Sequence, residues 1–297
     1  MNIFSIYSMS NSPYQEWQAE LLDWSFVQSG QPGQLIRLCS EDPYHLERGY
    51  SFSKVAKTIC TPGYSKIDWP YFRLWQWNVP ISPFKRQVYW PVMNKPCSLK
   101  HLFEHLTFQD ADTLVFLDPD MVFTKPWTPA FDRGTVFGQK WFGYSQSYCE
   151  RSSIHPELCP ETDNDCVMYP FAIKAGDLKK MVTDIKHFAL EGYKTALSNN
   201  VSGHWMSDMP AFQTAMMKHE LVMQPRDNIG LCNNWENRND PDAPILHYCQ
   251  PMLDHKGNQI WWKWDYVPWE TPPCLNWATN RVDREVLDML TRKVREA

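Results

Sequence analysis

Residues 113–123 read TLVFLDPDMVF, a short apolar run that ends abruptly in two aspartates. Such a run is typical of a buried strand with both faces covered. Asp118 and Asp120 would then lie just past the carboxyl end of that strand, where open α/β sheets bind their ligands. Alternate carboxylates in an extended turn can reach one hard cation, which can bridge to a diphosphate. The stretch therefore predicts an α/β fold with a metal site at the edge of its sheet.

Strands and helices alternate on both sides of this stretch. Residues 2–7 form a strand-like run, a helical pattern begins near Tyr14, and a second strand is expected at 35–39. The further expected elements are helices around 99–106, 178–188, 207–218 and 282–294, and strands at 135–137, 221–224 and 244–248. Residues 61–96, rich in Pro and Trp, are expected to be irregular, and 142–166 to form a loop. This alternation predicts an α/β/α sandwich with a mostly parallel sheet.

The composition excludes several classes of protein. The 297 residues carry a formal net charge of −5 and are 43% hydrophobic, which suits one large domain or two small ones. No stretch approaches the roughly 20 apolar residues of a membrane-spanning helix. The first residues lack the basic and apolar segments of a secretory signal. We therefore expect a cytoplasmic protein without a membrane anchor. The net negative charge argues against a surface that is basic all over, but it allows a local basic groove.

The motifs of several enzyme classes are missing from the sequence. No Walker A, G-x-G-x-x-G or G-x-S-x-G motif occurs. The sequence therefore lacks the usual signatures of ATP-dependent phosphoryl transfer, dinucleotide redox enzymes and α/β-hydrolases. The nine cysteines include no C-x-x-C pair, which argues against a zinc ribbon. Free thiols are the expected state, although Cys149, Cys159 and Cys166 could pair in an oxidising compartment.

Three further features could carry chemistry. His101, Glu104 and His105 match H-x-x-E-H, an inverted zinc-protease signature, but apolar neighbours favour an ordinary half-buried helix. Asp208 would open a helix, where an acid is favoured by the helix dipole and can also be a cap. His247 lies in a short expected strand, where a lone histidine is usually structural.

Six blocks of the sequence occur in an order that resembles a known enzyme family. They are YQEWQAELLDWSFVQSGQPGQLIRLCS (14–40), MNKPCSLKHLFEHL (93–106), FLDPDMVFTKPW (116–127), YPFAIKAGDLKKM (169–181), HWMSDMPAF (204–212) and ILHYCQP (245–251). In this order they resemble the plant hydroxyproline O-arabinosyltransferase and peptidyl serine α-galactosyltransferase group of GT-A glycosyltransferases. The resemblance covers about residues 1–250.

This resemblance implies a fold, a reaction and a metal. The fold would be a Rossmann-like GT-A domain over residues 1–255, with a Trp-rich segment and an amphipathic helix at 256–297 packed on the same domain. The reaction would be retaining transfer of arabinose, or else galactose or glucose, from a UDP-sugar, with Mn²⁺ or Mg²⁺ as the cofactor. Asp118 and Asp120 match the metal-binding carboxylates, and His247 matches the position of a third metal ligand.

The resemblance also assigns residues to the reacting sugar and to the donor. Asp208 matches an acid near the reacting sugar and is the candidate catalytic residue. It could stabilise charge, orient the sugar or receive a proton. Lys95 would lie near the donor phosphates as a point charge. Tyr7, Asn94 and Trp205, together with Asp118, complete the expected donor-binding set.

The acceptor stays open at this point. A hydroxyl of peptidyl hydroxyproline or serine fits the resemblance, whereas 5-hydroxymethylcytosine in DNA fits a phage enzyme that works in the host cytoplasm. A DNA acceptor predicts a basic groove beside the metal site. A non-catalytic carbohydrate-binding protein and a zinc hydrolase are more distant alternatives, and no feature indicates the oligomeric state. Nine of the 15 Trp lie at 69–90 and 261–277. We expect these two segments to wall the acceptor site or to clamp the C-terminal helix.

Overall fold

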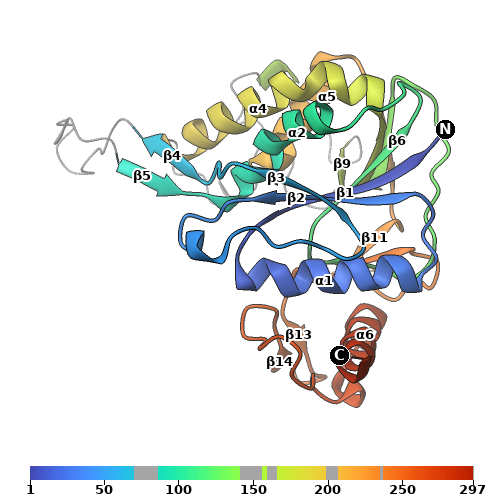
Figure 1. Cartoon of the computed structure of the whole chain (residues 1–297). Helices are drawn as coiled ribbons and strands as arrows, with labels where there is room; N and C mark the ends of the chain where they lie inside the picture. The colour runs from blue at the N-terminus through green and yellow to red at the C-terminus, as the bar shows by residue number, and fades with distance from the viewer. Residues whose placement is uncertain (70–85, 141–155, 159–165, 199–206, 235–236, 297) are drawn as a thin grey trace.

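A seven-stranded sheet forms the centre of the molecule, with helices on both faces (Figure 1). The structure is a computed structural model that describes residues 1–69, 86–140, 156–158, 166–198, 207–234 and 237–296. The strand order is β10-β8-β9-β6-β1-β2-β3. The seven strands are β1 (Ile3–Ser10), β2 (Gln34–Ser40), β3 (Lys57–Thr61), β6 (Thr113–Leu117), β8 (Thr135–Lys140), β9 (Val167–Lys174) and β10 (Val222–Arg226). All are parallel to their neighbours except β9, which runs antiparallel to β6 and β8. The expected mostly parallel, Rossmann-like α/β/α fold is therefore confirmed.

The central position of β6 explains its sequence. The strand lies between β1 and β9, and all of its residues, Thr113–Leu117, are buried. Since helices cover both faces of the sheet, neither side of this strand meets water, and a continuous apolar run results instead of an alternating one. The chain leaves β6 at the carboxyl edge of the sheet. Asp118 and Asp120 consequently come to lie at that edge.

The helices form two groups around the sheet (Figure 1). The helices are α1 (Pro13–Gln28), α2 (Asn94–His105), α4 (Ala175–Ser198), α5 (Asp208–Lys218) and α6 (Arg281–Glu296). Helices α2, α4 and α5 cover one face, and α1 lies against the other. Helix α1 begins where the sequence signals a start, because Ser12 is its N-cap and accepts a 3.4 Å hydrogen bond from the Gln15 N–H.

Helix α1 has apolar contacts on two sides. Ala19, Leu22 and Phe26 belong to the main core under the sheet. Trp17, Leu21 and Trp24 belong to a second core, which also contains Trp261 and the buried face of α6. The Trp24 indole N–H donates to the Glu296 carboxylate at 2.7 Å, which ties α1 to the end of α6. The C-terminal segment therefore packs on the far side of α1. The division of the chain at residue 255 stays a prediction.

Several elements differ from the expectation. The prediction that 61–96 is irregular was wrong in part, because β4 (Lys66–Trp69) and β5 (Arg86–Tyr89) form an antiparallel pair. Strands β3 and β9 were not predicted. The strand expected at 244–248 is confirmed by β12 (Ile245–His247), whereas the short strands β7 (Met121–Phe123), β11 (Gly230–Cys232), β13 (Met252–Leu253) and β14 (Gln259–Trp261) were not predicted. Short strands of this kind are stabilised by neighbours distant in sequence, so local periodicity identifies them poorly.

The remaining described elements are single turns of 3₁₀ helix at Leu46–Arg48, Pro91–Met93, Pro156–Leu158 and Leu275–Trp277. Most of the loop expected at 142–166, including Cys149 and Cys159, lies outside the described residues. In the described part of the chain, no helix combines the length and the apolar character needed to cross a bilayer.

A buried carboxyl at the start of α6 makes the stability of the fold depend on pH. Burial raises the pKa of Asp283 to about 6, although hydrogen bonds from neighbouring asparagines such as Asn280 act to lower it. The folded chain then holds this proton to a higher pH than the unfolded chain does. The free energy of unfolding consequently falls as the pH rises from about 4 to about 6.

Asp283→Asn should therefore stabilise the protein at high pH alone. We expect the free energy of unfolding to rise by about 1–2 kcal/mol at pH 8 and to change little at pH 4. Urea denaturation at both pH values measures the difference. Asp288→Asn, on the same helix but half exposed, is the matched control. An equal gain at the two pH values would contradict the assignment.

Candidate metal and donor site

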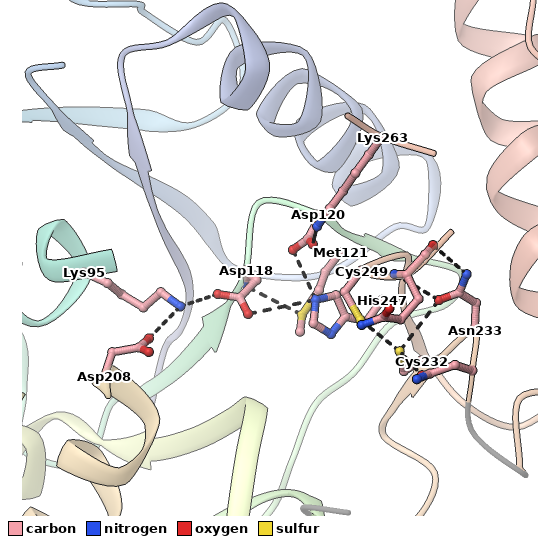
Figure 2. A network of polar contacts seen from close by, with 12 residues as sticks. Lys95, Asp118, Asp120, Met121, Asp208, Cys232, Asn233, His247, Cys249 and Lys263 are labelled. Atoms are coloured by element: carbon pink, nitrogen blue, oxygen red, sulfur yellow. Dashed lines mark hydrogen bonds and ion pairs between the residues drawn. The ribbon is translucent and has the colours of Figure 1, made fainter. Parts of the chain in front are cut away.

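Two antiparallel strands bring the aspartates and the histidine together. Strand β7 follows the Asp118–Asp120 turn and pairs with β12, which places Met121 opposite His247. The turn is held by backbone hydrogen bonds, because the Met121 N–H donates to the Asp118 carbonyl at 3.1 Å and the Tyr248 N–H donates to the Asp120 carbonyl at 3.2 Å. Figure 2 shows the resulting arrangement, in which the His247 ring faces both aspartates. The three side chains thus converge although His247 follows Asp120 by 127 positions in the sequence.

The geometry of this cluster suits a divalent cation. His247 Nε2 lies 3.2 Å from Asp120 Oδ1 and 4.0 Å from Asp118 Oδ2. One ligand atom from each residue falls within 4.8 Å of the others, and within the described segments this is the only such group of His, Cys, Asp or Glu. Two carboxylates with one imidazole form a mixed oxygen and nitrogen donor set, which fits Mn²⁺ well. The placement of Asp118, Asp120 and His247 therefore agrees with the metal site expected from the sequence.

A lysine joins the first aspartate to the candidate catalytic acid. The Lys95 ammonium pairs with Asp118 and lies 3.0 Å from Asp208 Oδ2. It also lies 4.0 Å from the centre of the Tyr169 ring. Burial alone would lower the pKa of Lys95, but the two carboxylates raise it well above its ordinary value. Lys95 is therefore a fixed positive charge between Asp118 and Asp208.

Asp208 is the first residue of α5, and its carboxyl group is buried. Burial raises the pKa of Asp208 to about 6, with the charge of Asp118 acting in the same direction and Lys95 opposing it. A carboxylate with such a pKa is ionised at neutral pH and more basic than an ordinary aspartate. The residue before it, Ser207, occupies the N-cap position without a side-chain capping bond. The Asp208 carboxylate thus points at the Lys95 ammonium, on the side of α5 that faces the Asp118–Asp120 turn (Figure 2).

A second lysine, which the sequence did not reveal, reaches the site from the C-terminal segment. Lys263 is buried, and its ammonium contacts Asp120 Oδ2 (Figure 2). Burial alone would raise the pKa of Asp120, but Lys263 and His247 hold it far below the usual range. The only sequence signal for Lys263 is its place between Trp262 and Trp264 in the Trp-rich segment. Each aspartate of the turn is therefore neutralised by its own lysine.

The structure does not bring Tyr7 to the cluster. Tyr7 is buried in β1, and its hydroxyl donates to Asp23 at 2.7 Å and accepts from Arg37 Nε at 2.6 Å. Arg37 and Asp23 also form a 2.6 Å ion pair. These contacts occupy the hydroxyl inside a closed polar network between β1, β2 and α1. A donor-binding role for Tyr7 stays a prediction, and this network gives it no support.

Asn94 holds loops next to the site. Its Nδ2 donates to Ser10 Oγ at 2.8 Å at the end of β1, and its Oδ1 accepts from the Tyr64 N–H at 2.7 Å. Asn94 directly precedes Lys95 in the sequence, at the start of α2. Its contacts indicate that it positions Lys95 through the backbone. Trp205 lies outside the described residues.

The zinc-protease signature is not completed by the fold. His101 Nε2 lies 2.6 Å from the Tyr64 hydroxyl, and His101 Nδ1 lies 2.7 Å from Glu104. Both ring nitrogens of His101 are therefore engaged. Among the described residues, no third ligand joins His101 and His105 in a group that could hold a metal. The contacts support an ordinary polar face of α2.

Comparisons with known proteins point to sugar transfer. No family model matches the chain. Among curated proteins, the peptidyl serine alpha-galactosyltransferase of Arabidopsis thaliana is 25% identical to it over 288 residues, a match that covers 87% of this chain and 32% of the plant protein. The chain thus spans about a third of the length of that relative. This similarity and the Asp118–Asp120–His247 cluster together support glycosyl transfer as the general activity.

Proposed function

We propose that this chain is a metal-dependent, retaining glycosyltransferase that moves a sugar from a UDP-sugar to a hydroxyl group. Arabinose is the first candidate sugar, with galactose or glucose as the second. The observation that carries the proposal is the Asp118–Asp120–His247 cluster at the carboxyl edge of the sheet, flanked by Lys95 and Lys263. An arrangement of this kind can bind a cation and, with it, the diphosphate of a nucleotide sugar.

The residues of the site divide the work between the leaving group and the sugar. A divalent cation held by Asp118, Asp120 and His247 would neutralise the charge that develops on the departing UDP. Lys95 and Lys263 flank the two aspartates on opposite sides (Figure 2). With a cation on the aspartates, both ammonium groups would be available to the diphosphate oxygens. The same lysines would thus neutralise the aspartates in the empty site and the donor in the loaded site.

Asp208 would act on the sugar. It lies across Lys95 from Asp118, and this arrangement supports a role beside the donor sugar. Its carboxylate can stabilise positive charge on the reacting sugar ring, orient the ring, or accept the proton of the attacking hydroxyl. Its raised pKa favours the last of these roles, because a more basic carboxylate is a better proton acceptor.

A non-catalytic carbohydrate-binding protein fits the site less well. Binding sites for neutral sugars do not require a cluster of buried or half-buried charged groups in mutual contact, and burying such groups costs free energy. That cost is expected where the charges serve a reaction. The cluster therefore favours an enzyme.

A peptidyl hydroxyl is the acceptor that we propose, with hydroxymethylated DNA as the alternative. The plant relative is named for galactosyl transfer to peptidyl serine. A DNA acceptor predicts a basic groove beside the metal site. Lys95, a candidate for such a groove, is instead paired with two carboxylates, and Lys100 lies exposed on α2. The side chains of Lys85 and Arg86, two further basic residues that could line such a groove, lie outside the described residues.

Incubation with a panel of UDP-sugars and Mn²⁺ tests the proposed function. Released UDP is measured with and without a chelator, first without acceptor and then with hydroxyproline or serine peptides or with hydroxymethylated DNA. We expect UDP release that depends on Mn²⁺ and increases with a peptide acceptor. No UDP release with any of the sugars and any of the acceptors would overturn the proposal.

Lys263→Met separates the two roles of the lysine. We expect Mn²⁺ to bind the variant more tightly, because the ammonium no longer competes for Asp120. We expect kcat/KM for the UDP-sugar to fall by about 10- to 100-fold, because the diphosphate loses a charged hydrogen-bond donor. Calorimetry with Mn²⁺ and UDP release measure the two effects, with Lys256→Met, exposed in the same segment, as the control. Unchanged Mn²⁺ affinity with unchanged kcat/KM would contradict both roles.

The Trp-rich C-terminal segment has one tryptophan in the second core and another that is exposed. Trp261 is buried in the second core, whereas Trp264 is 60% exposed and stacks on Tyr14 at 4.1 Å between ring centres. Its exposure and its position directly after Lys263 support a place for Trp264 at the rim of the site. We expect Trp261 to hold the C-terminal helix and Trp264 to contact the acceptor.

Trp264→Ala tests the second expectation. The KM for the acceptor should rise by roughly 2- to 10-fold, the size of one lost aromatic contact, while kcat changes little. Trp277→Ala is the matched control, because Trp277 is 56% exposed on a turn of the same C-terminal segment. Equal KM values for the two variants would remove Trp264 from the acceptor site.

A further inference from the structure

Two cysteines meet beside the metal-binding strand. Cys232 is the last residue of β11, and Cys249 follows β12 by two residues. Their Sγ atoms lie 2.9 Å apart, which is closer than two unbonded sulfur atoms normally approach. Figure 2 shows the pair next to His247. A disulfide has its sulfurs about 2.05 Å apart, so the two Sγ atoms lie within about 1 Å of bonding distance.

Strand pairing and hydrogen bonds already hold the backbone segments of the two cysteines next to each other. Strands β11 and β12 are parallel, and Cys232 is the register partner of His247. The Asn233 side chain donates to the Gln250 carbonyl at 2.9 Å and accepts from the Gln250 N–H at 3.3 Å. These hydrogen bonds join the residues next to Cys232 to those next to Cys249. A disulfide would consequently need only a small movement of the side chains.

The two thiols differ in access. Cys232 is 2% exposed, whereas Cys249 is partly exposed. The Cys232 Sγ also lies 2.8 Å from Asn234 Oδ1, which can accept a hydrogen bond from this thiol. A small disulfide from solution would therefore react first with Cys249. Cys232 would then be in position to attack the resulting mixed disulfide.

We propose that Cys232 and Cys249 form a reversible disulfide by exchange with a small-molecule disulfide such as oxidised glutathione. In the first step the Cys249 thiolate attacks oxidised glutathione, which forms a mixed disulfide and releases one reduced glutathione. In the second step the Cys232 thiolate attacks the Cys249 sulfur and releases the other. One protein disulfide and two molecules of reduced glutathione result, and both thiol protons end on the released glutathione.

The bond would fasten the loop that carries His247. It would close the segment 232–249, which contains strand β12, and so join the ends of β11 and β12 covalently. Cross-linking a segment of this length restricts the unfolded chain and raises the unfolding temperature. The ligand atoms of Asp118, Asp120 and His247 take no part in the bond. This inference does not rest on the proposed function, because its readouts need no sugar donor.

Treatment of the whole folded chain with oxidised or reduced glutathione tests the proposal. After oxidation, free thiols are alkylated, and the protein is digested and analysed by mass spectrometry without reduction. We expect a cross-linked peptide pair that contains Cys232 and Cys249, and a rise in Tm of about 5 °C that dithiothreitol reverses. Cys249→Ser should lose both effects, while Cys274→Ser, which removes an exposed cysteine of the C-terminal segment, should keep them.

Two outcomes would overturn the proposal. One is full alkylation of both Cys232 and Cys249 after oxidation of the folded protein. The other is a bridge between different cysteines with the same rise in Tm in Cys249→Ser. The Tm of the reduced Cys249→Ser variant checks that the substitution leaves the fold intact, and the peptide map of the unsubstituted chain decides the question where it does not.

Discussion

Asp120→Asn is expected to lower the rate of UDP release from the preferred UDP-sugar by about 10³-fold or more, since a metal ligand contributes several kcal/mol of charge stabilisation. The asparagine keeps the shape of the side chain but removes the charge that binds the cation. The rate of UDP release at saturating Mn²⁺ is the measurement. Asp242→Asn is the matched control, because Asp242 is an exposed aspartate paired with Lys125.

The variant must also be shown to fold. Asp120→Asn leaves the buried Lys263 without its carboxylate, and an unpaired buried charge is destabilising by about 3–5 kcal/mol. The double variant Asp120→Asn with Lys263→Met removes both charges and should recover stability without recovering activity. A rate close to that of the unsubstituted chain in either variant would remove Asp120 from the metal site.

Asp208→Asn is the substitution with the second largest expected effect. We expect kcat to fall by about 10²- to 10³-fold, the range for a group that moves a proton or stabilises charge in the transition state. Mn²⁺ affinity should stay the same, since Asp208 contacts Lys95 and is not part of the Asp118–Asp120–His247 cluster. Steady-state kinetics together with calorimetry therefore distinguish Asp208 from Asp120.

The control for Asp208 is another acid in the first turn of a helix. Asp177 lies in the first turn of α4, is buried, and accepts a 2.7 Å hydrogen bond from the Gly134 N–H. Asp177→Asn should lower stability and leave kcat nearly unchanged. If the two substitutions lower kcat equally, Asp208 has only a structural role at the start of α5.

The Asp118–Asp120–His247 cluster could be predicted from the sequence for two different reasons. Asp118 and Asp120 come directly after a run of buried residues, and a buried strand in an open sheet places the residues after its last position at the carboxyl edge. His247 carries no such local signal, because a lone histidine in a short strand is usually structural. Its place came from the family resemblance. The structure explains it by the pairing of β7 with β12.

Lys263 could not be predicted, and Tyr7 was assigned to a role that the structure does not support. Lys263 reaches Asp120 across 143 positions of sequence, through a segment without matching blocks in the family. Tyr7 lies in the expected strand, but its environment depends on Asp23 and Arg37 from two other elements. In both cases tertiary contacts decide the role, and no periodicity or spacing in the sequence encodes them.

Calorimetric titration of UDP into the protein, with and without Mn²⁺, measures whether Asp118, Asp120 and His247 hold a cation through which a UDP-sugar binds. We predict stoichiometric UDP binding in the presence of Mn²⁺, greatly weakened binding without it, and the same weakening in Asp120→Asn with Mn²⁺ present. Equal UDP affinity in all three conditions, or no UDP binding in any of them, would contradict the account.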